Sequence, residues 1–464
     1  MLTNLNWLEV GKKFPPDSEI ARLEMYHTNK ALFECRHAEV YAEDLKRIER
    51  VIGNFGEVVS YPVILNFQKL ISLKVSDLLL GEPPQFQAKN EGQQGTIDDI
   101  IDRSNTVNTS QQVVIDASRY GDGLFYIRKE GDKGIIDLTN PLVWFPIVNP
   151  DNAREVTNHV LAWTYENGDN KYLKTQIHYK GYYDEMLFEV LGSTISKKIE
   201  ETKNIKTGLD DFAVIQVPNI RTSDRATGYD DYTDIDSIIS EIIVRVGQIA
   251  KILDKHASPS MSGPSAALEK DIVTGEYRLK SGNFFPRDTK EDPPVEYITW
   301  DGQLEANFKQ IDKLINLLYT ISEMGSAIFG DLTSGTGQVP SGTALKRLMV
   351  SPLAKVNRLR MRLDPALKKA IALCSQLGGP KIAIGDISIN WQDGLPGDAW
   401  EEAQIIEKRT AGAPTMSMKR VLTQYDGMTE DAAAEEVDRI NEESMMQSPV
   451  SGIPGFGGTD EPLE

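Results

Sequence analysis

The sequence predicts an α+β fold divided among several domains, and three observations lead to that prediction. A chain of 464 residues is long enough for roughly two to four domains with a sizeable core. Apolar residues recur at helical spacing in the first 80 residues and in three later segments. From about residue 110 to 220, β-branched and aromatic runs alternate with Asn, Gly and Asp, which is typical of antiparallel strands. Helices placed before a run of strands favour the α+β class.

Two helices are expected in the N-terminal part of the chain. Asp17 can cap a helix that extends through Ile52, with mixed charges on its exposed face. A second helix is expected from Pro62 to Leu80. Gly81 follows it and prolines come next, which is a strong signal for the end of a helix.

The strand-rich region is expected to be a set of hairpins. Residues 111–140 contain two short β-rich runs separated by Gly-Asp turns. The same pattern continues through 144–150, 159–191 and 212–220. These runs predict antiparallel strands, so the region forms the sheet part of a mixed domain.

The clearest helical pattern follows residue 229. Asp230, Asp231 and Asp234 are expected in the opening turns of this helix, where negative charge complements the helix dipole. Its apolar residues fall at helical spacing: Ile235, Ile238, Ile239, Ile242, Ile243, Val246, Ile249 and Leu253. A second long helix is predicted at 303–329, ending at Gly330. It carries Ile311, Leu314, Ile315, Leu318, Ile321 and Ile328.

A small insert separates these two long helices. Residues 258–300 are rich in Gly, Pro and charged residues, and their strand candidates are 276–286 and 293–300. After the second helix, residues 330–346 form a patch rich in Gly, Ser and Thr.

A third long helix is predicted from Thr343 to Leu377. Pro352 and Pro365 lie inside it, so a bent or broken helix is expected, spanning roughly 50 Å. Residues 381–398 predict one or two strands. An acidic helical module then covers 398–447, and residues 448–464 have a composition that predicts disorder.

The Gly-rich patch nearly matches a phosphate-binding loop. Residues 337–343 follow the pattern G-x-x-x-x-G-K-[ST], except that Gly342 runs directly into Thr343 and the lysine is missing. The motif also requires a preceding buried strand, whereas a long helix is predicted here. The sequence therefore favours a loop that connects two helices over a nucleotide site.

Metal, cofactor and catalytic motifs are absent from the sequence. The five histidines are scattered, and neither CxxC nor HExxH occurs. No Ser/His/Asp arrangement or GxSxG pattern is present, so no enzyme is predicted and no cofactor is expected. Cys35 and Cys374 give no disulfide framework and suit a reducing cytosol. No membrane-spanning helix or signal peptide is expected, because no apolar run of about 18 residues occurs and the N-terminus lacks the signal pattern.

Charge is distributed unevenly along the chain. The net charge of −19 argues against tight static binding of nucleic acid, but it leaves open a protein past which DNA slides. Residues 341–380 carry a local charge of +7, and residues 398–447 carry −7. These charges can be solvated helix faces or pairs within one subunit. Alternatively, they meet across a subunit interface or line a channel. The basic residues are Lys346, Arg347, Lys355, Arg358, Arg360, Arg362, Lys368 and Lys369.

The order of these parts, together with four local stretches, resembles the portal proteins of tailed bacteriophages in their siphovirus-type branch. The first stretch, NFQKLISLKVSDLLLGEPPQFQ, is similar to the family's helix that ends in a leucine-rich Gly-Glu-Pro. SGTALKRLMVSPLAKVNRLRMRLDPALKKAI is similar to its Ser-Gly-x-Ala-Leu helix with a basic continuation. ISINWQDGLPGDAWEEA and EDAAAEEVDRINEE resemble its strand with x-Leu-Pro-x-Asp and its acidic closing helix. The resemblance spans nearly the whole chain.

The resemblance implies a multi-domain subunit of a ring, usually a dodecamer, at one capsid vertex. Its wing would comprise residues 1–228 with 381–391, and the long bent helix 343–380 would belong to the wing. Residues 229–257 and 302–329 would be the stem helices, with a small α/β clip at 258–301. A tunnel loop would occupy 330–342, and a helical crown with a disordered tail would occupy 392–464.

The resemblance also implies partners and contact residues. The ring would pass double-stranded DNA through its channel during packaging and ejection, and would bind the terminase large subunit, major capsid and scaffolding proteins, and head-completion or adaptor proteins. No membrane is involved; the ring would be assembled in the host cytoplasm and reside in the virion. The expected tunnel-loop residues are Asp331, Leu332, Thr333, Ser334, Gly335, Thr336, Gly337, Gln338, Val339 and Pro340. The expected clip residues that meet terminase or adaptor are Glu276, Tyr277, Arg278, Lys280, Arg287 and Lys290.

The tunnel loop departs from the picture of a charged clamp. It carries no basic residue, and Asp331 is its single acid, so its contacts to DNA would come from hydroxyls, Gln338 and backbone groups. Steric gating or a weak grip is therefore expected. Two other classes remain as alternatives. One is an acidic ring-forming head–tail connector, or other structural virion protein, without DNA contact; the other is a packaging enzyme with its own ATPase or nuclease activity.

Overall fold

The computed structural model describes residues 1–52, 57–59, 62–257, 304–330, 347–392, 399–411, 414–425, 428 and 430–447, and four short strands between 258 and 303. The chain separates into two compact units, Met1–Gly394 and Leu395–Glu464, and each is described by itself. No helix in the described part of the chain is long and apolar enough to cross a membrane.

The first predicted helix is divided in the structure. Helix α1 covers Ile20–Phe33 and ends because Cys35 adopts a left-handed backbone, with φ of 65°. The amide of Arg36 then donates to the carbonyl of Ala31 at 2.8 Å, which closes the end of the helix. The prediction of one helix from Asp17 to Ile52 was therefore wrong. The elements that replace its second half are α2 (His37–Val40), α3 (Ala42–Leu45), a 3-10 turn (Lys46–Ile48), β1 (Arg50–Ile52) and its partner β2 (Glu57–Val59).

The second predicted helix, α4, covers Phe67–Leu80 and ends before Gly81 as expected. It starts later than Pro62, because the side chain of Asn66 caps it by accepting from the Lys69 amide at 3.0 Å. Two further helices, α5 (Glu91–Arg103) and α6 (Thr106–Tyr120), were not predicted. The interpretation of residues 111–120 as part of a β-rich run was wrong, since α6 buries Val113, Val114 and Ala117 at helical spacing.

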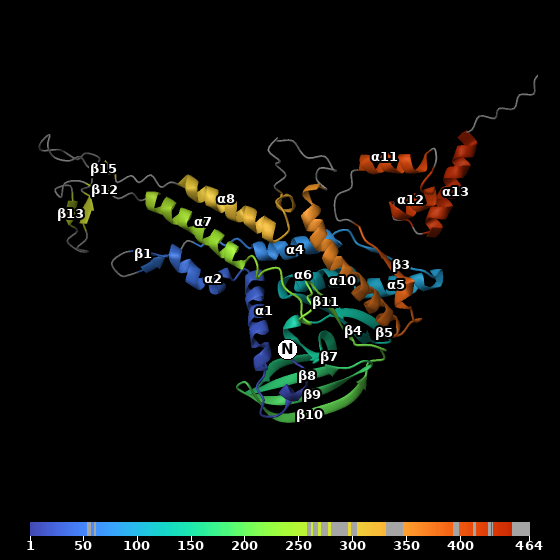
Figure 1. The fold of residues 1–464 in the computed structure, drawn as a ribbon, viewed down its shortest axis with the longest axis horizontal. Helices are drawn as coiled ribbons and strands as arrows, with labels where there is room; N and C mark the ends of the chain where they lie inside the picture. Colours follow the sequence, from blue (N-terminus) through green and yellow to red (C-terminus); the bar gives the residue numbers. More distant parts are fainter. Residues whose placement is uncertain are drawn as a thin grey trace, which may run out of the picture. The chain divides into compact units, whose positions relative to one another are not determined.

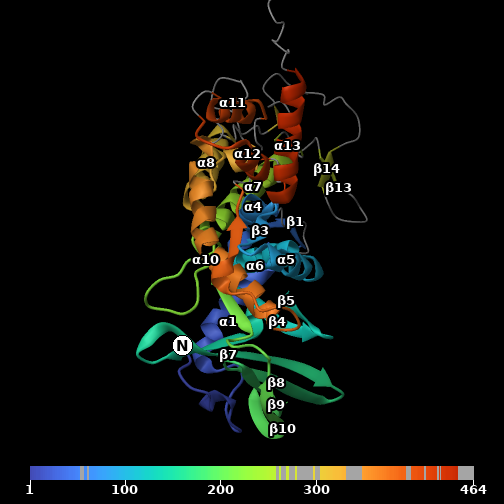
Figure 2. The same cartoon turned by 90° about the vertical axis from the view of Figure 1, so that its right-hand side faces the viewer.

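The strands between residues 122 and 218 pair antiparallel, as predicted, and they form two separate sheets. The smaller sheet has the order β11-β4-β5, from β4 (Asp122–Glu130), β5 (Lys133–Leu138) and β11 (Val214–Pro218). The larger sheet is a five-stranded meander that forms one end of unit 1 (Figures 1 and 2). Its strands are β6 (Trp144–Asn149), β7 (Asn152–Asn167), β8 (Asn170–His178), β9 (Tyr182–Leu191) and β10 (Thr194–Lys206). Trp7 and Leu8 from the N-terminus pack with Phe145 and Phe188 in the core of this sheet.

The two long helices α7 (Asp236–Ala257) and α8 (Leu304–Ile321) lie side by side and run in opposite directions (Figure 1). Their existence was predicted, but two boundaries differ. α7 begins at Asp236, so Asp230, Asp231 and Asp234 precede the helix instead of forming its opening turns. α8 ends at Ile321 because Glu323 and Gly325 adopt left-handed backbones; a 3-10 turn (Ala327–Phe329) follows.

The insert between these helices contains short antiparallel pairs. β12 (Met261–Ser262) pairs with β15 (Glu296–Tyr297), and β13 (Leu268–Lys270) pairs with β14 (Tyr277–Leu279). Strands therefore occur within both predicted strand candidates, 276–286 and 293–300.

The third long helix, α10, covers Val350–Ser375 and is not broken by its prolines. Pro352 lies in the first turn, where backbone N–H groups have no partner within the helix. Pro365 lies inside the helix, which continues through it. After α10, β16 (Ile387–Asn390) pairs antiparallel with β3 (Gln85–Ala88), about 300 residues earlier in the chain. Among the described residues 381–392, a single strand therefore follows α10.

The second unit is helical, as predicted. Its helices are α11 (Ala399–Thr410), α12 (Met418–Gln424) and α13 (Glu430–Gln447), and α12 packs against α13. Ser417 caps α12 by accepting from the Arg420 amide.

Candidate functional site at the junction of three long helices

A buried ion pair joins α10 to the segments that begin α7 and end α8. The side chain of Lys355 lies in the first half of α10 and is 8% exposed, while that of Asp231 is 2% exposed. The Nζ atom of Lys355 lies 2.9 Å from Oδ1 of Asp231. The same ammonium donates a hydrogen bond to the carbonyl of Ser322, just after α8, at 2.9 Å. One side chain therefore holds three separate stretches of the chain together.

Asp231 is the centre of a larger buried network. Its Oδ2 accepts a hydrogen bond from Ser118 of α6 at 2.6 Å, and its Oδ1 accepts one from Asn219 at 3.0 Å. The hydroxyl of Ser118 also lies 2.9 Å from that of Ser72 in α4, which lies 2.8 Å from the hydroxyl of Tyr232. Burial raises the pKa of Tyr232, so this hydroxyl stays protonated. The network satisfies the buried charges, which is what makes such a pair tolerable inside a protein.

A second, exposed contact strengthens the same junction. Arg358 forms an ion pair with Glu323, and Ser351 donates to the carbonyl of Glu323 at 3.0 Å. Both α10 residues thus contact the turn that follows α8. The chain on both sides of the segment 331–346 is therefore connected at this junction, through the turn after α8 on one side and α10 on the other.

The start of α7 is held by a separate polar group of residues. Oδ1 of Asp236 accepts hydrogen bonds from the Tyr41 hydroxyl at 3.2 Å and from the Gln68 amide at 3.1 Å. Burial raises the pKa of Asp236 to about 6, against the effect of these two donors. Gln68 also contacts the ring of His37 at 3.0 Å. These contacts tie α7 to the N-terminal helices and to α4.

The predicted basic residues of α10 separate into different environments. The expectation of a channel or interface position does not hold for Lys355, because its charge is paired inside the subunit. Arg360 donates to the carbonyl of Gln392 at 2.8 Å and lies over the ring of Trp391. Arg347 is exposed, and Arg362 lines a pocket that is described below.

Two more predicted basic residues form ion pairs within the subunit. Lys368 pairs with Asp364 at 2.9 Å, and Lys369 pairs with Asp211 at 2.6 Å. The interpretation of the basic residues as pairs within one subunit thus holds for Lys355, Lys368 and Lys369, and for Arg358 through Glu323.

Other predicted site residues lie outside the described part of the chain. These are Lys346, the whole tunnel loop from Asp331 to Pro340, and the clip residues Glu276, Lys280, Arg287 and Lys290. Tyr277 and Arg278 lie in β14.

Reasoning from the sequence missed Asp231, Ser322 and Asn219 as partners of the junction. Lys355 itself carried a signal, because it falls at the helical spacing of the apolar residues Val356, Leu359 and Leu363. A lysine on the apolar face of a helix predicts a buried cation that needs a partner. Nothing in the sequence pattern identified that partner as Asp231.

The junction has the properties of a mechanical anchor. Its charged groups are paired and hydrogen-bonded. In the described part of the chain, no group of three or more His, Cys, Asp or Glu side chains is placed to hold a metal ion. The arrangement fixes the relative positions of the long helices.

The family model described as "Phage portal protein, SPP1 Gp6-like" matches residues 61–450. No curated protein matches the chain in sequence.

Several solved structures are similar in fold at low sequence identity. One, from the virion of a native gene transfer agent particle, is 12% identical, covers 77% of this chain and 89% of its own, and gives a TM-score of 0.42. A second, from the neck of the native particle computed with C12 symmetry, is 12% identical, covers 78% and 89%, and gives 0.44. A third, from the neck of the empty particle computed with C6 symmetry, is 13% identical, covers 77% and 89%, and gives 0.43.

Proposed function

Because this chain belongs to the SPP1 Gp6-like family of phage portal proteins, a structural family without enzymatic activity, we propose that it forms a closed ring around a channel for double-stranded DNA. The ring would contain twelve copies and would occupy one vertex of the capsid in the virion. DNA would enter through it during packaging and leave through it during ejection.

The observation that carries this proposal is the uncovered apolar surface of the α7–α8 pair. Large apolar side chains on these helices are exposed in a single copy of the chain: Leu253 (52%), Phe308 (51%), Leu317 (42%) and Ile321 (44%). By the 3.6-residue period, Phe308 lies on a different side of α8 from Leu317 and Ile321. A subunit of a ring has one neighbour on each side, so apolar residues on two sides of one helix fit that arrangement. We therefore infer that neighbouring copies in the ring cover these side chains.

The parts of the chain would take the roles that family membership suggests. Residues 1–228 with 381–391 would form the wing, together with the helix in 343–380. Residues 229–257 and 302–329 would form the stem. The insert 258–301 would be the clip, which binds terminase during packaging and adaptor proteins afterwards.

The remaining segments would lie along the DNA path. Residues 330–342 would form the tunnel loop, and residues 392–464 the crown inside the head. A net charge of −19 on each copy gives DNA few phosphate contacts, so the duplex can slide. The uncharged composition of the tunnel loop, apart from Asp331, fits a steric contact with the moving duplex.

The buried junction suits this role. Force on a tunnel loop would be transmitted to α10 and to the end of α8. Lys355 connects both of these elements to Asp231, which precedes α7. A rigid framework at both ends of the loop would confine movement to the loop itself.

Electron microscopy of the purified full-length chain tests the proposal. Wide-brimmed rings with a through-channel in end-on views, and native mass spectra of one ring size, are expected. A monomer, an open filament or a ring without a channel would overturn it. A ring whose channel is too narrow for a duplex would favour the acidic connector without DNA contact.

A further inference from the structure

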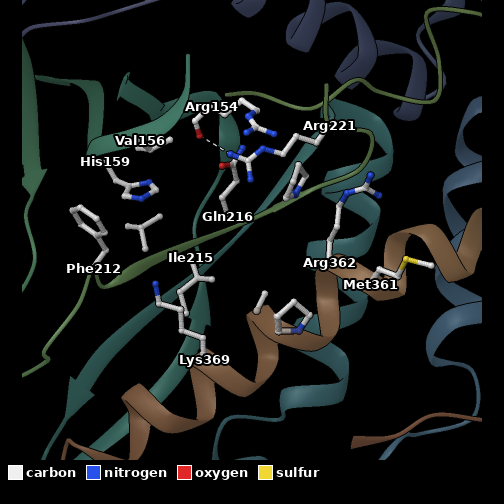
Figure 3. A pocket seen from close by; sticks show the side chains of 14 residues that line it. Arg154, Val156, His159, Phe212, Ile215, Gln216, Arg221, Met361, Arg362 and Lys369 are labelled. Atoms are coloured by element: carbon white, nitrogen blue, oxygen red, sulfur yellow. Dashed lines mark hydrogen bonds between the residues drawn. The ribbon is translucent and has the colours of Figure 1, made fainter. Parts of the chain in front are cut away.

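A basic pocket opens on unit 1 between α10, β7, β11 and the loop that follows β11. The cavity has a volume of about 420 Å³ (Figure 3). Four cationic side chains line it, and none of its lining residues is acidic: the cations are Arg154, Arg221, Arg362 and Lys369. This is an unusual concentration of positive charge in a chain whose net charge is −19.

Only one of the four cations has a carboxylate partner among the described residues. Lys369 pairs with Asp211 at 2.6 Å. Arg221 donates to the backbone carbonyl of Arg154 at 2.5 Å, and Arg362 donates to that of Arg358 at 2.8 Å. Burial, together with the nearby charges of Arg358 and Arg221, lowers the pKa of Arg362. Three guanidinium groups therefore line the pocket without an ion-pair partner among the described residues.

The pocket also has an apolar lining. Phe212, Ile215 and Pro365 contribute to it, and Met361 is 74% exposed at its edge. A free phosphate or a DNA backbone would pair with the arginines but would leave this apolar surface uncovered. Carboxylates placed beside an apolar side chain satisfy both parts of the pocket. The chemistry thus favours an acidic protein segment.

A segment of that chemistry lies on α5 of the same chain. Asp98 and Asp102 are exposed and one helical turn apart, and Ile101 is half-buried beside them. Asp99 is already paired with Arg103 and Lys133. Neither Asp98 nor Asp102 forms an ion pair within the described residues.

The two features lie on different sides of unit 1. In Figure 2, the yellow-green loop that follows β11 projects on the left, whereas α5 and the β4–β5 hairpin lie on the right. Complementary patches on opposite sides of a subunit form a head-to-tail contact, which closes into a ring when the rotation allows it.

We propose that this pocket receives α5 of the neighbouring copy in the ring, with Arg221 and Arg362 paired to Asp98 and Asp102 of that copy. The proposal rests on the ring described under the proposed function. Arginine suits the role because its planar group binds carboxylates through two parallel hydrogen bonds. The contact would neutralise the clustered guanidinium groups and cover the apolar lining of the pocket.

Charge reversal in the full-length chain tests the proposal. The pocket variant is Arg221→Glu/Arg362→Glu, the helix variant is Asp98→Arg/Asp102→Arg, and the third variant combines all four changes.

Mass photometry over a dilution series gives the concentration at which half of the chains are in rings. Each reversal should raise it by about tenfold or more, because like charges then face each other. The combined variant should return it toward the wild-type value. Lys197→Glu/Lys206→Glu on exposed positions of β10 is the matched control and should leave it unchanged.

The outcomes separate the two claims. If the wild-type chain forms no ring, the proposed function fails. If wild-type rings form and the reversals have no effect, or if the combined variant is not rescued, the pairing of the pocket with α5 is overturned. Circular dichroism of each variant excludes unfolding as the cause. A duplex-DNA affinity that falls with the pocket variant while rings persist would make the pocket a DNA site and would also overturn the pairing.

Discussion

The ammonium of Lys355 and the carboxylate of Asp231 lie 2.9 Å apart inside the protein, although 124 residues separate them in sequence. Lys355 belongs to the helix that follows the segment 331–346, and Asp231 precedes the long helix α7. The pair thus connects the two ends of the region proposed to form stem and tunnel.

Removing one partner of this pair should destabilise unit 1 strongly. Lys355→Met leaves the Asp231 carboxylate buried without its counter-ion, and a loss of about 3–5 kcal/mol in the free energy of unfolding is expected. Chemical denaturation followed by circular dichroism measures it. Lys368→Met removes a more exposed pair with Asp364 and should cost only about 0–1 kcal/mol. Equal losses for the two variants would show that the buried pair stabilises the fold no more than the exposed pair does.

A pH effect is expected from His178. Its ring is fully buried, its two nitrogens find no hydrogen-bond partner in the described part of the chain, and burial lowers its pKa to about 4. The unfolded chain, with an ordinary histidine pKa of about 6.5, takes up the proton more readily than the folded one. The stability contribution is therefore complete above pH 6.5 and is lost as the pH falls from there toward 4, by up to about 3 kcal/mol.

Replacing this histidine should reduce the loss of stability in acid. His178→Phe keeps the contacts with Tyr126 and Tyr183 and removes the titrating group. Denaturation midpoints at pH 5 and pH 8 should differ less in the variant than in the wild type. His159, whose pKa burial lowers to about 3, acts in the same direction, so part of the dependence should remain. The exposed His27 offers a matched control, and an effect of His27→Gln as large as that of His178→Phe would contradict the assignment.

Polar substitutions on α8, a proposed stem helix, should weaken assembly while sparing the fold. Leu317→Ser/Ile321→Ser changes two exposed apolar side chains of α8, which a neighbouring copy would cover. The loss of two buried apolar contacts, about 1.5–3 kcal/mol each, should shift the chain from rings toward monomers. Light scattering coupled to size exclusion reports the mass. Leu191→Ser, at an exposed position at the end of β9, is the control; rings of unchanged stability in the stem variant would count against the proposed interface.

The proposed tunnel loop, residues 330–342, should act by its bulk and not by its charge. Deletion of residues 333–338 should impair DNA packaging or retention, because a shorter loop no longer reaches the duplex. Asp331→Ala, which removes the single acid, should change them less. Packaged DNA protected from nuclease measures both variants in a particle-assembly system. Unchanged packaging and retention with the shortened loop would remove the basis for steric gating.

The large elements could be predicted from the sequence because their patterns are long and regular. The isoleucine series of α7 and the alternation in the strands from β6 to β10 extend over many residues. The break at Cys35 could not be predicted, since a left-handed backbone is uncommon at a residue other than glycine. Helix α6 was misread because Val113 and Val114 favour strands locally, whereas burial against α4 and β4 selects the helix.

The partners of the charged residues at the candidate site could not be predicted from the sequence either. The surplus of charge on α10 was visible in the sequence, but its division into buried and surface residues depends on partners far away in the chain. Asp231, Asp211 and Glu323 neutralise Lys355, Lys369 and Arg358 across long sequence separations. The pocket is lined by Arg154, Arg221 and Arg362, which come from three segments far apart in the sequence. No local sequence pattern therefore predicts it.

The most direct test of the proposed DNA channel is its width and lining at its narrowest point, measured in a cryo-electron-microscopy reconstruction of the assembled full-length chain. The proposed function predicts a closed ring whose narrowest point admits a B-form duplex and is lined by residues 330–342, with α7 and α8 surrounding the channel. A channel closed to a duplex, or one whose narrowest point is formed by another segment, would contradict it.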